Sequence, residues 1–211
     1  GATGGTLAFT GGITATAPST TVNGTLTAAG SAVISLGRVS VASDSTIGGT
    51  STGQITLGAT TLVDGVTLTL GTGIANVISL SSVSGAADGS ASNITINTTG
   101  AVTVSGAIGT DIGTLTITNS GGTTFSGAVS ATTVTLTNTT GTIAFNGALT
   151  ATTLNTATQA YNVGLNATTG TITNAVTFSN TGTLALGATG GTLAFTGGIT
   201  ATAPSTTVNG T

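Results

Sequence analysis

An internal duplication most constrains what this chain can fold into. Residues Gly1–Thr25 reappear without a change as Gly187–Thr211. Identity at positions where substitution is physically tolerated indicates recent duplication, homogenisation of the gene or deliberate construction, and it is typical of long repeat arrays. We therefore interpret residues 1–186 as one long unit and residues 187–211 as the start of the next. We expect the natural chain to hold many copies, with Leu following Thr211.

A shorter period lies inside this unit. Its marker is a five-residue motif: an apolar residue, then Ser, Thr or Asn, then Gly, then Gly or Ala, then an aliphatic residue. The motif occurs at Phe9–Ile13, Val104–Ile108, Phe125–Val129 and Phe145–Leu149, and the last three of these follow one another at steps of 21 and then 20 in the numbering. Periods of about twenty residues are typical of stacked repeats, so one structural turn is predicted to have this length.

Between the glycines the chain alternates apolar and hydroxyl side chains. Alternation with a period of two predicts a β-strand, and Thr, Val and Ile favour strands. The clearest such segments are Gln54–Leu57, Val66–Leu70, Leu115–Thr118 and Val134–Thr137. We predict short strands of about four to six residues and essentially no α-helix, since Gly and β-branched residues are poor helix formers.

Two architectures accommodate short strands in such a repeat. In a parallel β-solenoid, each coil lays its strands directly above those of the coil below. In an array of immunoglobulin-like sandwiches, a unit of this length would form two domains. A sandwich gives no reason for one local motif to recur at so short a period, and the chain has no Trp for a large aromatic core. The sequence therefore favours the all-β parallel solenoid, with about nine coils in each unit.

The residue inventory agrees with stacked coils. Coils about 4.8 Å apart place equivalent side chains in columns, where like charges would repel one another. The chain holds one Arg, four Asp, no Lys and no Glu among 211 residues. Thr, Ser and Asn fill the outward positions instead, while Gly and Asn-Gly supply the positive φ angles that corners need.

Composition also excludes several functions. A chain with net charge −3 and a single cation cannot neutralise a row of phosphates, so we expect neither nucleic-acid binding nor attraction to anionic membranes. No apolar run reaches the length of a membrane span. The chain begins at Gly1 without Met or a signal peptide, so we expect a mature fragment. The absence of Cys and His removes thiol chemistry and most metal sites.

Two stretches carry a resemblance to known families. Gly5–Ile13, running on to Val22–Thr27, is similar to the Gly-Thr-Leu-rich repeats of autotransporter passenger domains, and it also resembles the β-strand repeats of filamentous-haemagglutinin-type surface proteins. Residues 113–154 have the same character. The resemblance implies a parallel β-helix, export to the surface of a bacterial cell, and a role in adhesion or biofilms. It supplies no catalytic residues.

One motif suggests catalysis. Gly49–Gly53 matches the G-x-S-x-G pattern of a nucleophile elbow, with Ser51 at its centre. That arrangement needs a histidine base and an acid at a strand-turn-helix. The chain has no His, so we interpret the match as chance in a sequence rich in Gly, Ser and Thr.

The four carboxylates have an interpretable spacing. Asp44, Asp64, Asp88 and Asp111 follow one another at intervals of 20, 24 and 23, close to one coil. They could stack on one face beside Arg38 and form a weak calcium or glycan stripe. Calcium sites gather several oxygen ligands closely, so we favour turn residues at Asp64-Gly65 and Asp88-Gly89 and solvated groups elsewhere.

Thr-x-Thr pairs are abundant and suggest a second class of function. They occur at Thr14–Thr16, Thr25–Thr27, Thr67–Thr69, Thr116–Thr118 and Thr171–Thr173. A flat array of such pairs on a solenoid can match a crystal lattice such as ice. Thr is also simply a good uncharged residue for an outward strand position. Gly-Thr-(Leu/Ile) sites are unequally spaced, for example by 29 between Gly141 and Gly170 but by 9 between Gly182 and Gly191, and we expect this to spoil a flat lattice.

The remaining candidates are weaker. Six Asn-x-Ser/Thr sequons, at Asn23, Asn93, Asn97, Asn138, Asn166 and Asn209, matter only in a glycosylating host. The single tyrosine, Tyr161, is more consistent with a packed or half-exposed strand residue than with a binding platform.

The sequence thus predicts a non-catalytic shaft segment of an extracellular filament or repetitive cell-surface adhesin. Its expected partners are further copies of itself, end to end or side by side, with cell-surface or glycan ligands as further candidates. We assign no catalytic, cofactor-binding or metal-binding residues. A module that binds glycan or ice through its Thr/Ser/Asn face stays open, as does a functional amyloid formed by intermolecular stacking.

Overall fold

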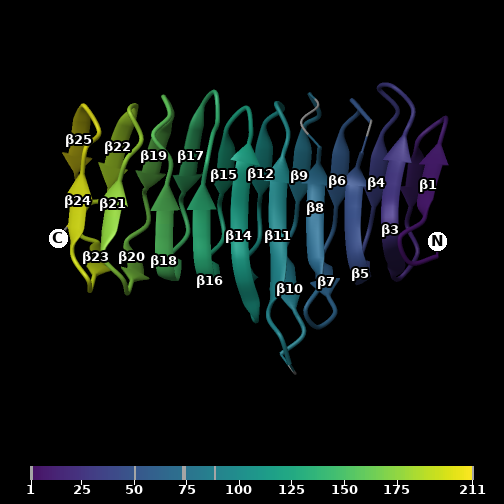
Figure 1. The fold of residues 1–211 in the computed structure, drawn as a ribbon, viewed down its shortest axis with the longest axis horizontal. Helices are drawn as coiled ribbons and strands as arrows, with labels where there is room; N and C mark the ends of the chain where they lie inside the picture. Colours follow the sequence, from purple (N-terminus) through teal and green to yellow (C-terminus); the bar gives the residue numbers. More distant parts are fainter. Residues whose placement is uncertain (1, 50, 73–74, 88, 211) are drawn as a thin grey trace.

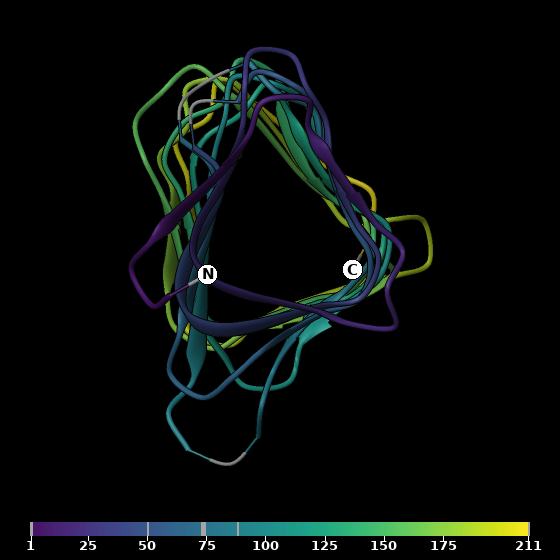
Figure 2. The ribbon, with the colours of Figure 1, turned by 90° about the vertical axis from the view of Figure 1, so that its right-hand side faces the viewer.

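The chain winds into one continuous β-solenoid. The computed structural model describes residues 2–49, 51–72, 75–87 and 89–210, and the strands in these ranges stack side by side along a single axis (Figure 1). All strand pairings given for them are parallel, and no helix occurs within them. Seen along the axis, the coils trace a triangle (Figure 2). The predicted all-β parallel solenoid is confirmed, and the sandwich, which needs antiparallel sheets, is wrong.

Face 1 of the triangle is a sheet of ten short strands, one from each successive coil. Each central strand points its first and third residues into the core and its middle residue outward. The strands of face 1 are β2 (Ile13–Ala15), β4 (Ile34–Leu36), β6 (Ile55–Leu57), β9 (Ile78–Leu80), β12 (Val102–Val104), β15 (Thr123–Phe125), β17 (Thr142–Phe145), β19 (Asn162–Leu165), β22 (Thr183–Leu186) and β25 (Ser205–Val208).

Faces 2 and 3 share four long strands that bend at the corner between them. These are β3 (Thr20–Ala28), β5 (Val39–Gly48), β16 (Val129–Leu136) and β18 (Leu149–Thr156). Face 2 holds their first halves together with β7 (Thr60–Leu62), β10 (Val83–Gly85), β13 (Ile108–Gly109), β20 (Thr169–Ile172) and β23 (Thr192–Phe195).

Face 3 holds the second halves of the long strands. In β5, for example, Val39–Val41 pair with β7 on face 2, whereas Ser45–Gly48 pair with β8 on face 3. The other strands of face 3 are β1 (Thr6–Phe9), β8 (Thr67–Gly71), β11 (Ser92–Asn97), β14 (Ile112–Asn119), β21 (Val176–Phe178) and β24 (Ile199–Ala201).

About nine coils make up the stack, and coil length varies among them. Along face 1 the partner of Ile13 is Ile34, whereas the partner of Ile78 is Val102, which lies three positions further along the chain than an equal step would give. The extra residues of this longer coil fall between β10 and β11 in the sequence, and the described parts of that connection protrude at one corner of the triangle (Figure 2). Coil length therefore varies in the connections while the strands stay in register.

The motif that predicted the period lies at the ends of strands. Val104, Phe125 and Phe145 form successive rungs of one inward column on face 1, as their regular spacing requires. The Phe125 and Phe145 rings stack with centroids 4.8 Å apart, and both side chains are fully buried. An offset stack of this kind adds about 0.5–1.5 kcal/mol to the gain from burial.

A column of buried polar side chains follows the corner between faces 3 and 1. Thr98 Oγ1 donates to Asn76 at 2.7 Å, and Thr139 Oγ1 donates to the Ser120 carbonyl at 2.8 Å. Each hydroxyl also accepts an N–H from the glycine two residues on, for example from Gly141 to Thr139 at 3.2 Å. Because buried polar groups are costly unless paired, these bonds pin successive corners to one another.

Candidate binding surfaces

Face 3 presents two columns of hydroxyl and amide side chains in register. Its strands are long enough to point two residues of each coil outward, separated by one buried residue. The first column contains Thr67, Asn93, Thr114, Thr133 and Thr153. The second contains Thr25, Thr46, Thr69, Thr95, Thr116, Thr135 and Asn155. We call these two columns the threonine array; apart from Asn155, which is exposed, its members are half-buried.

The array forms a two-dimensional lattice. Neighbours in one column are about 4.8 Å apart, and the two members from one strand are about 6.6 Å apart. Strands β5, β8, β11 and β14 lie side by side along this face in Figure 1. None of the array positions carries a charge. A surface of this kind offers repeated hydroxyl groups and methyl groups to a ligand that itself repeats.

Unequal spacing in the sequence does not break this lattice, contrary to our expectation. The chain between Thr69 and Thr95 is longer than the chain between Thr116 and Thr135, yet both pairs are direct partners in neighbouring strands. Residues outside the strands absorb the difference, so the register of backbone hydrogen bonds sets the columns. The Thr-x-Thr pairs at Thr67–Thr69 and Thr116–Thr118 lie on this face, although Thr118 is outside the two columns.

Face 1 offers a shallower alternative. A groove of about 590 Å³ follows the first four coils and is lined by Thr14, Ser35, Thr56 and Ser79 together with glycines and leucines. The outward column that these residues form continues at β17, β19 and β22 as Ala144, Gly164 and Ala185. A second column of outward polar residues begins only at β17, with Thr142, Asn162 and Thr183. Face 1 therefore carries one hydroxyl column that is interrupted at β17 and a second, short polar column that begins there.

The apparent nucleophile elbow is a corner of the solenoid. Ser51 is fully buried, its Oγ donates to the Ala32 carbonyl at 3.2 Å, and it accepts the Gly53 N–H at 3.2 Å. Both partners are backbone atoms, and no helix follows in the described part of the chain. Ser51 therefore belongs to the corner column of buried polar residues, and its hydroxyl is not exposed to a substrate.

Three of the four carboxylates lie along one corner of the triangle. Asp44, Asp64 and Asp111 all lie between face 2 and face 3; Asp88 is outside the described residues. Asp44 Oδ1 accepts the Thr67 N–H at 2.8 Å. Within the described ranges, no three His, Cys, Asp or Glu side chains gather closely enough to hold a metal ion.

The hypothesis that these carboxylates stack beside Arg38 is wrong. Arg38 is exposed between β4 and β5, at the corner between faces 1 and 2, and so lies at a different corner from the aspartates. Asp64 and Gly65 form a turn, with Gly65 at φ +69°, as predicted. Asp111 and Thr110 adopt positive φ angles, and Asp111 Oδ2 is buried without a hydrogen-bond partner. No pattern in the sequence predicted this backbone conformation.

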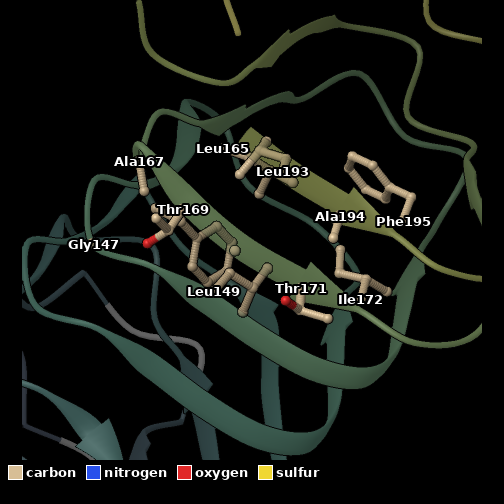
Figure 3. A pocket seen from close by; sticks show the side chains of 12 residues that line it. Gly147, Leu149, Leu165, Ala167, Thr169, Thr171, Ile172, Leu193, Ala194 and Phe195 are labelled. Carbon is tan, nitrogen blue, oxygen red and sulfur yellow. The ribbon is translucent and has the colours of Figure 1, made fainter. Parts of the chain in front are cut away.

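The core holds a small void. Gly170 occupies an inward position on face 2, between the partners Leu149 and Leu193 on the neighbouring strands. The apolar side chains around it enclose about 10 Å³ (Figure 3). A space of this size is at the lower limit for one water molecule, so it is a packing defect and no ligand pocket.

Tyr161 is a core residue, in agreement with the packed interpretation. Its side chain is 1% exposed, and its hydroxyl donates to the Leu136 carbonyl at 2.8 Å and accepts the Ala157 N–H at 3.1 Å. Burial raises the pKa of Tyr161 above its usual 10.0, although the hydrogen bond from Ala157 acts in the opposite direction. The ring and its hydroxyl lie at the corner between faces 3 and 1, where the column of buried polar side chains also lies.

Comparison of the chain with models of known protein families, with characterised proteins and with solved structures finds no match. The resemblance to bacterial surface proteins therefore stands at the level of the β-solenoid fold alone, which is common among adhesins and binding proteins. In the described part of the chain no helix is long and apolar enough to cross a membrane.

Proposed function

We propose that this chain is a shaft segment of an extracellular filament or repetitive cell-surface adhesin, and that it performs no catalysis. The observation that carries the proposal is the duplication of Gly1–Thr25 as Gly187–Thr211, since the second copy continues the coil stack without interruption. Adding further units would lengthen the rod. Such a protein acts through its shape and its strength.

Two further features support a structural role. Strength comes from backbone ladders and an apolar core, both of which are insensitive to salt because only five residues carry a charge. The outward columns are neutral hydroxyl groups, which allows neighbouring rods to approach without repulsion. We therefore assign further copies of this chain as its main partners.

The length of the rod tests this function. Chains of one, two and three units should form unbranched rods that lengthen by about 42 Å with each unit, at about 4.8 Å for each coil. Small-angle scattering and electron microscopy measure that increment. Beads separated by flexible linkers, or a length that does not rise linearly, would contradict the shaft.

The threonine array favours a second candidate function, which is binding to a periodic surface such as ice or a crystalline glycan. Two columns in register supply matched spacings in two directions, whereas the columns of face 1 are interrupted or short. Thermal hysteresis of the native chain tests the ice ligand, and retention on insoluble polysaccharides tests the glycan. The variant Thr95→Lys/Thr116→Lys should abolish either activity, and Thr61→Lys/Thr150→Lys on face 2 is the matched control. No hysteresis and no retention would discard this candidate.

A further inference from the structure

The two copies of the duplicated sequence occupy different faces of the triangle. Thr6–Phe9 lie on face 3 as β1, whereas the identical Thr192–Phe195 lie on face 2 as β23. The following strands shift in the same sense, since β2 on face 1 corresponds to β24 on face 3. The first part of β3, on face 2, corresponds to β25 on face 1. The whole segment is thus displaced by one face.

The corner motif nevertheless has the same local structure in the two copies. The Gly12 N–H donates to the Phe9 carbonyl at 3.1 Å, and the Gly198 N–H donates to the Phe195 carbonyl at 3.0 Å. Gly12 has φ +83° and Gly198 has φ +92°. A corner with one geometry therefore turns the chain from face 3 to face 1 in the first copy and from face 2 to face 3 in the second.

The same motif also forms the third corner. Phe125–Val129 and Phe145–Leu149 connect face 1 to face 2. One five-residue motif thus serves all three corners of the triangle, because the three sides are interchangeable for a chain that places one alternating strand on each. The sequence of a corner fixes the turn and leaves open which face precedes it.

The coil count follows from the ladders. Between β1 and β23 the chain completes eight coils and two of the three sides of the next. The long unit, residues 1–186, is therefore not a whole number of coils. Each added unit must start one face away from the start of the preceding unit.

The end of the stack shows what the added unit would contact. Leu186, Leu193, Phe195, Ile199 and Val208 line an open space of about 230 Å³ at this end, and Val208 is 65% exposed. Among the described strands, β23 is the last on the path of its sheet. The apolar end of the stack is therefore open to a further coil.

The first copy of the duplicated sequence shows which segment would cover this open end. At the first coil the identical strand β1 is covered by Thr25–Ala28, with Leu7 paired to Leu26. The same segment of a further unit begins at Thr211, which corresponds to Thr25 as Thr192 corresponds to Thr6. It fits the open end with the same apolar contacts.

We propose that this end is the seat of a second copy of the long unit, and that successive units are rotated by one third of a turn. The inference rests on the proposed shaft function. Three units contain about 26 coils and return to the starting face after about 125 Å. The threonine array then lies on face 3, face 2 and face 1 in turn, so the shaft displays it in three directions.

Cryo-electron microscopy of a chain of three units tests the rotation. The variant Thr95→Cys, in a chain that has no other Cys, marks the array of each unit with a maleimide-gold label. We expect labels about 42 Å apart along the rod, each turned by one third of a turn from the last. Labels in a straight line would overturn the rotation and leave the shaft standing. A chain that forms no continuous rod would overturn both.

Cysteine pairs test the same placement in the chain Gly1–Thr211. Thr171 and Ala194 are partners on face 2, and both side chains are exposed. Partner strands are about 4.8 Å apart, which is within the reach of a disulfide. Thr171→Cys/Ala194→Cys should cross-link nearly completely with oxidised glutathione. The control Thr177→Cys/Ala194→Cys joins face 3 to face 2 and should not. Preferential cross-linking of the control would overturn the displacement by one face.

Discussion

Strands β17 and β23 have nearly the same sequence but very different environments. Thr142–Phe145 reads TIAF and lies in the middle of the stack, where Ile143 and Phe145 are fully buried. Thr192–Phe195 reads TLAF and lies in the last coil, where Leu193 and Phe195 are only half-buried. The difference teaches that the coil above a strand, and not the strand's own sequence, completes its burial.

The largest effect is expected from the aromatic side chains of these two strands. Phe145→Ala should lower the free energy of unfolding by about 3–5 kcal/mol, because it removes a buried ring and leaves a cavity beside Phe125. Phe195→Ala should cost about 1 kcal/mol, since its ring contacts Phe178 edge to face on one side and solvent on the other. Guanidinium unfolding measures both. Equal losses would contradict the role of the covering coil.

Corner glycines test the same comparison between the middle of the stack and its ends. Gly147 and Gly11 hold the same position of the five-residue motif, but a Cβ on Gly147 would lie 2.2 Å from the backbone of Gly127 in the coil below. At Gly11, in the first coil, no atom lies within 4 Å of such a Cβ.

Gly147→Ala should therefore destabilise the protein by about 1–3 kcal/mol through overpacking. Gly11→Ala should be neutral or stabilise it by up to about 1 kcal/mol, since Ala restricts the unfolded chain. Thermal unfolding of the two variants gives the contrast. A loss at Gly11 as large as that at Gly147 would show that the local turn, and not the neighbouring coil, requires glycine.

The corner column of polar residues gives an intermediate effect. Thr139→Val removes a donor to the Ser120 carbonyl and an acceptor for the Gly141 N–H in a site that is 2% exposed. We expect a loss of about 1–3 kcal/mol in unfolding free energy. The neighbouring Thr140 is exposed, so Thr140→Val should change stability by less than about 0.5 kcal/mol. Similar values for the two variants would mean that the column does not join the interior coils.

The smallest effect concerns alkaline pH. Because the pKa of Tyr161 is raised in the folded chain, its contribution to stability is fully present below pH 10.0 and is lost as the pH rises through the higher folded value. Urea unfolding from neutral to strongly alkaline pH should show a fall that begins above the usual tyrosine pKa. Tyr161→Phe should lose about 1 kcal/mol at neutral pH with the hydrogen bonds, and should show a smaller alkaline fall. An unchanged fall would assign the effect to other groups.

Much of the fold could be predicted from the sequence because stacked coils repeat similar residues at a regular spacing. The spacing of Val104, Phe125 and Phe145 predicted the coil length, and alternation in Val66–Leu70 predicted a strand that the structure has at Thr67–Gly71. The three-sided cross-section has no such repeated pattern in the sequence. The same corner motif serves each of the three corners, so its recurrence cannot count the sides.

The candidate surface was harder to predict for a related reason. Sequence spacing between Thr69 and Thr95 includes residues of a protruding connection, so distance along the chain does not report the register across strands. The Asp spacing, close to one coil, suggested stacking on one face, and the structure has Asp44, Asp64 and Asp111 at one corner. It could not place Arg38, because a single residue has no period to compare.

Hydrogen exchange tests most directly whether each coil is stabilised by the next. Amide exchange of Thr192–Phe195 should be measured in the chain Gly1–Thr211 and in the same chain extended by residues 26–186 of a further unit. The account predicts rapid exchange in the shorter chain and, in the longer one, protection equal to that of Thr142–Phe145. Exchange that stays rapid when the further unit is present would contradict the account.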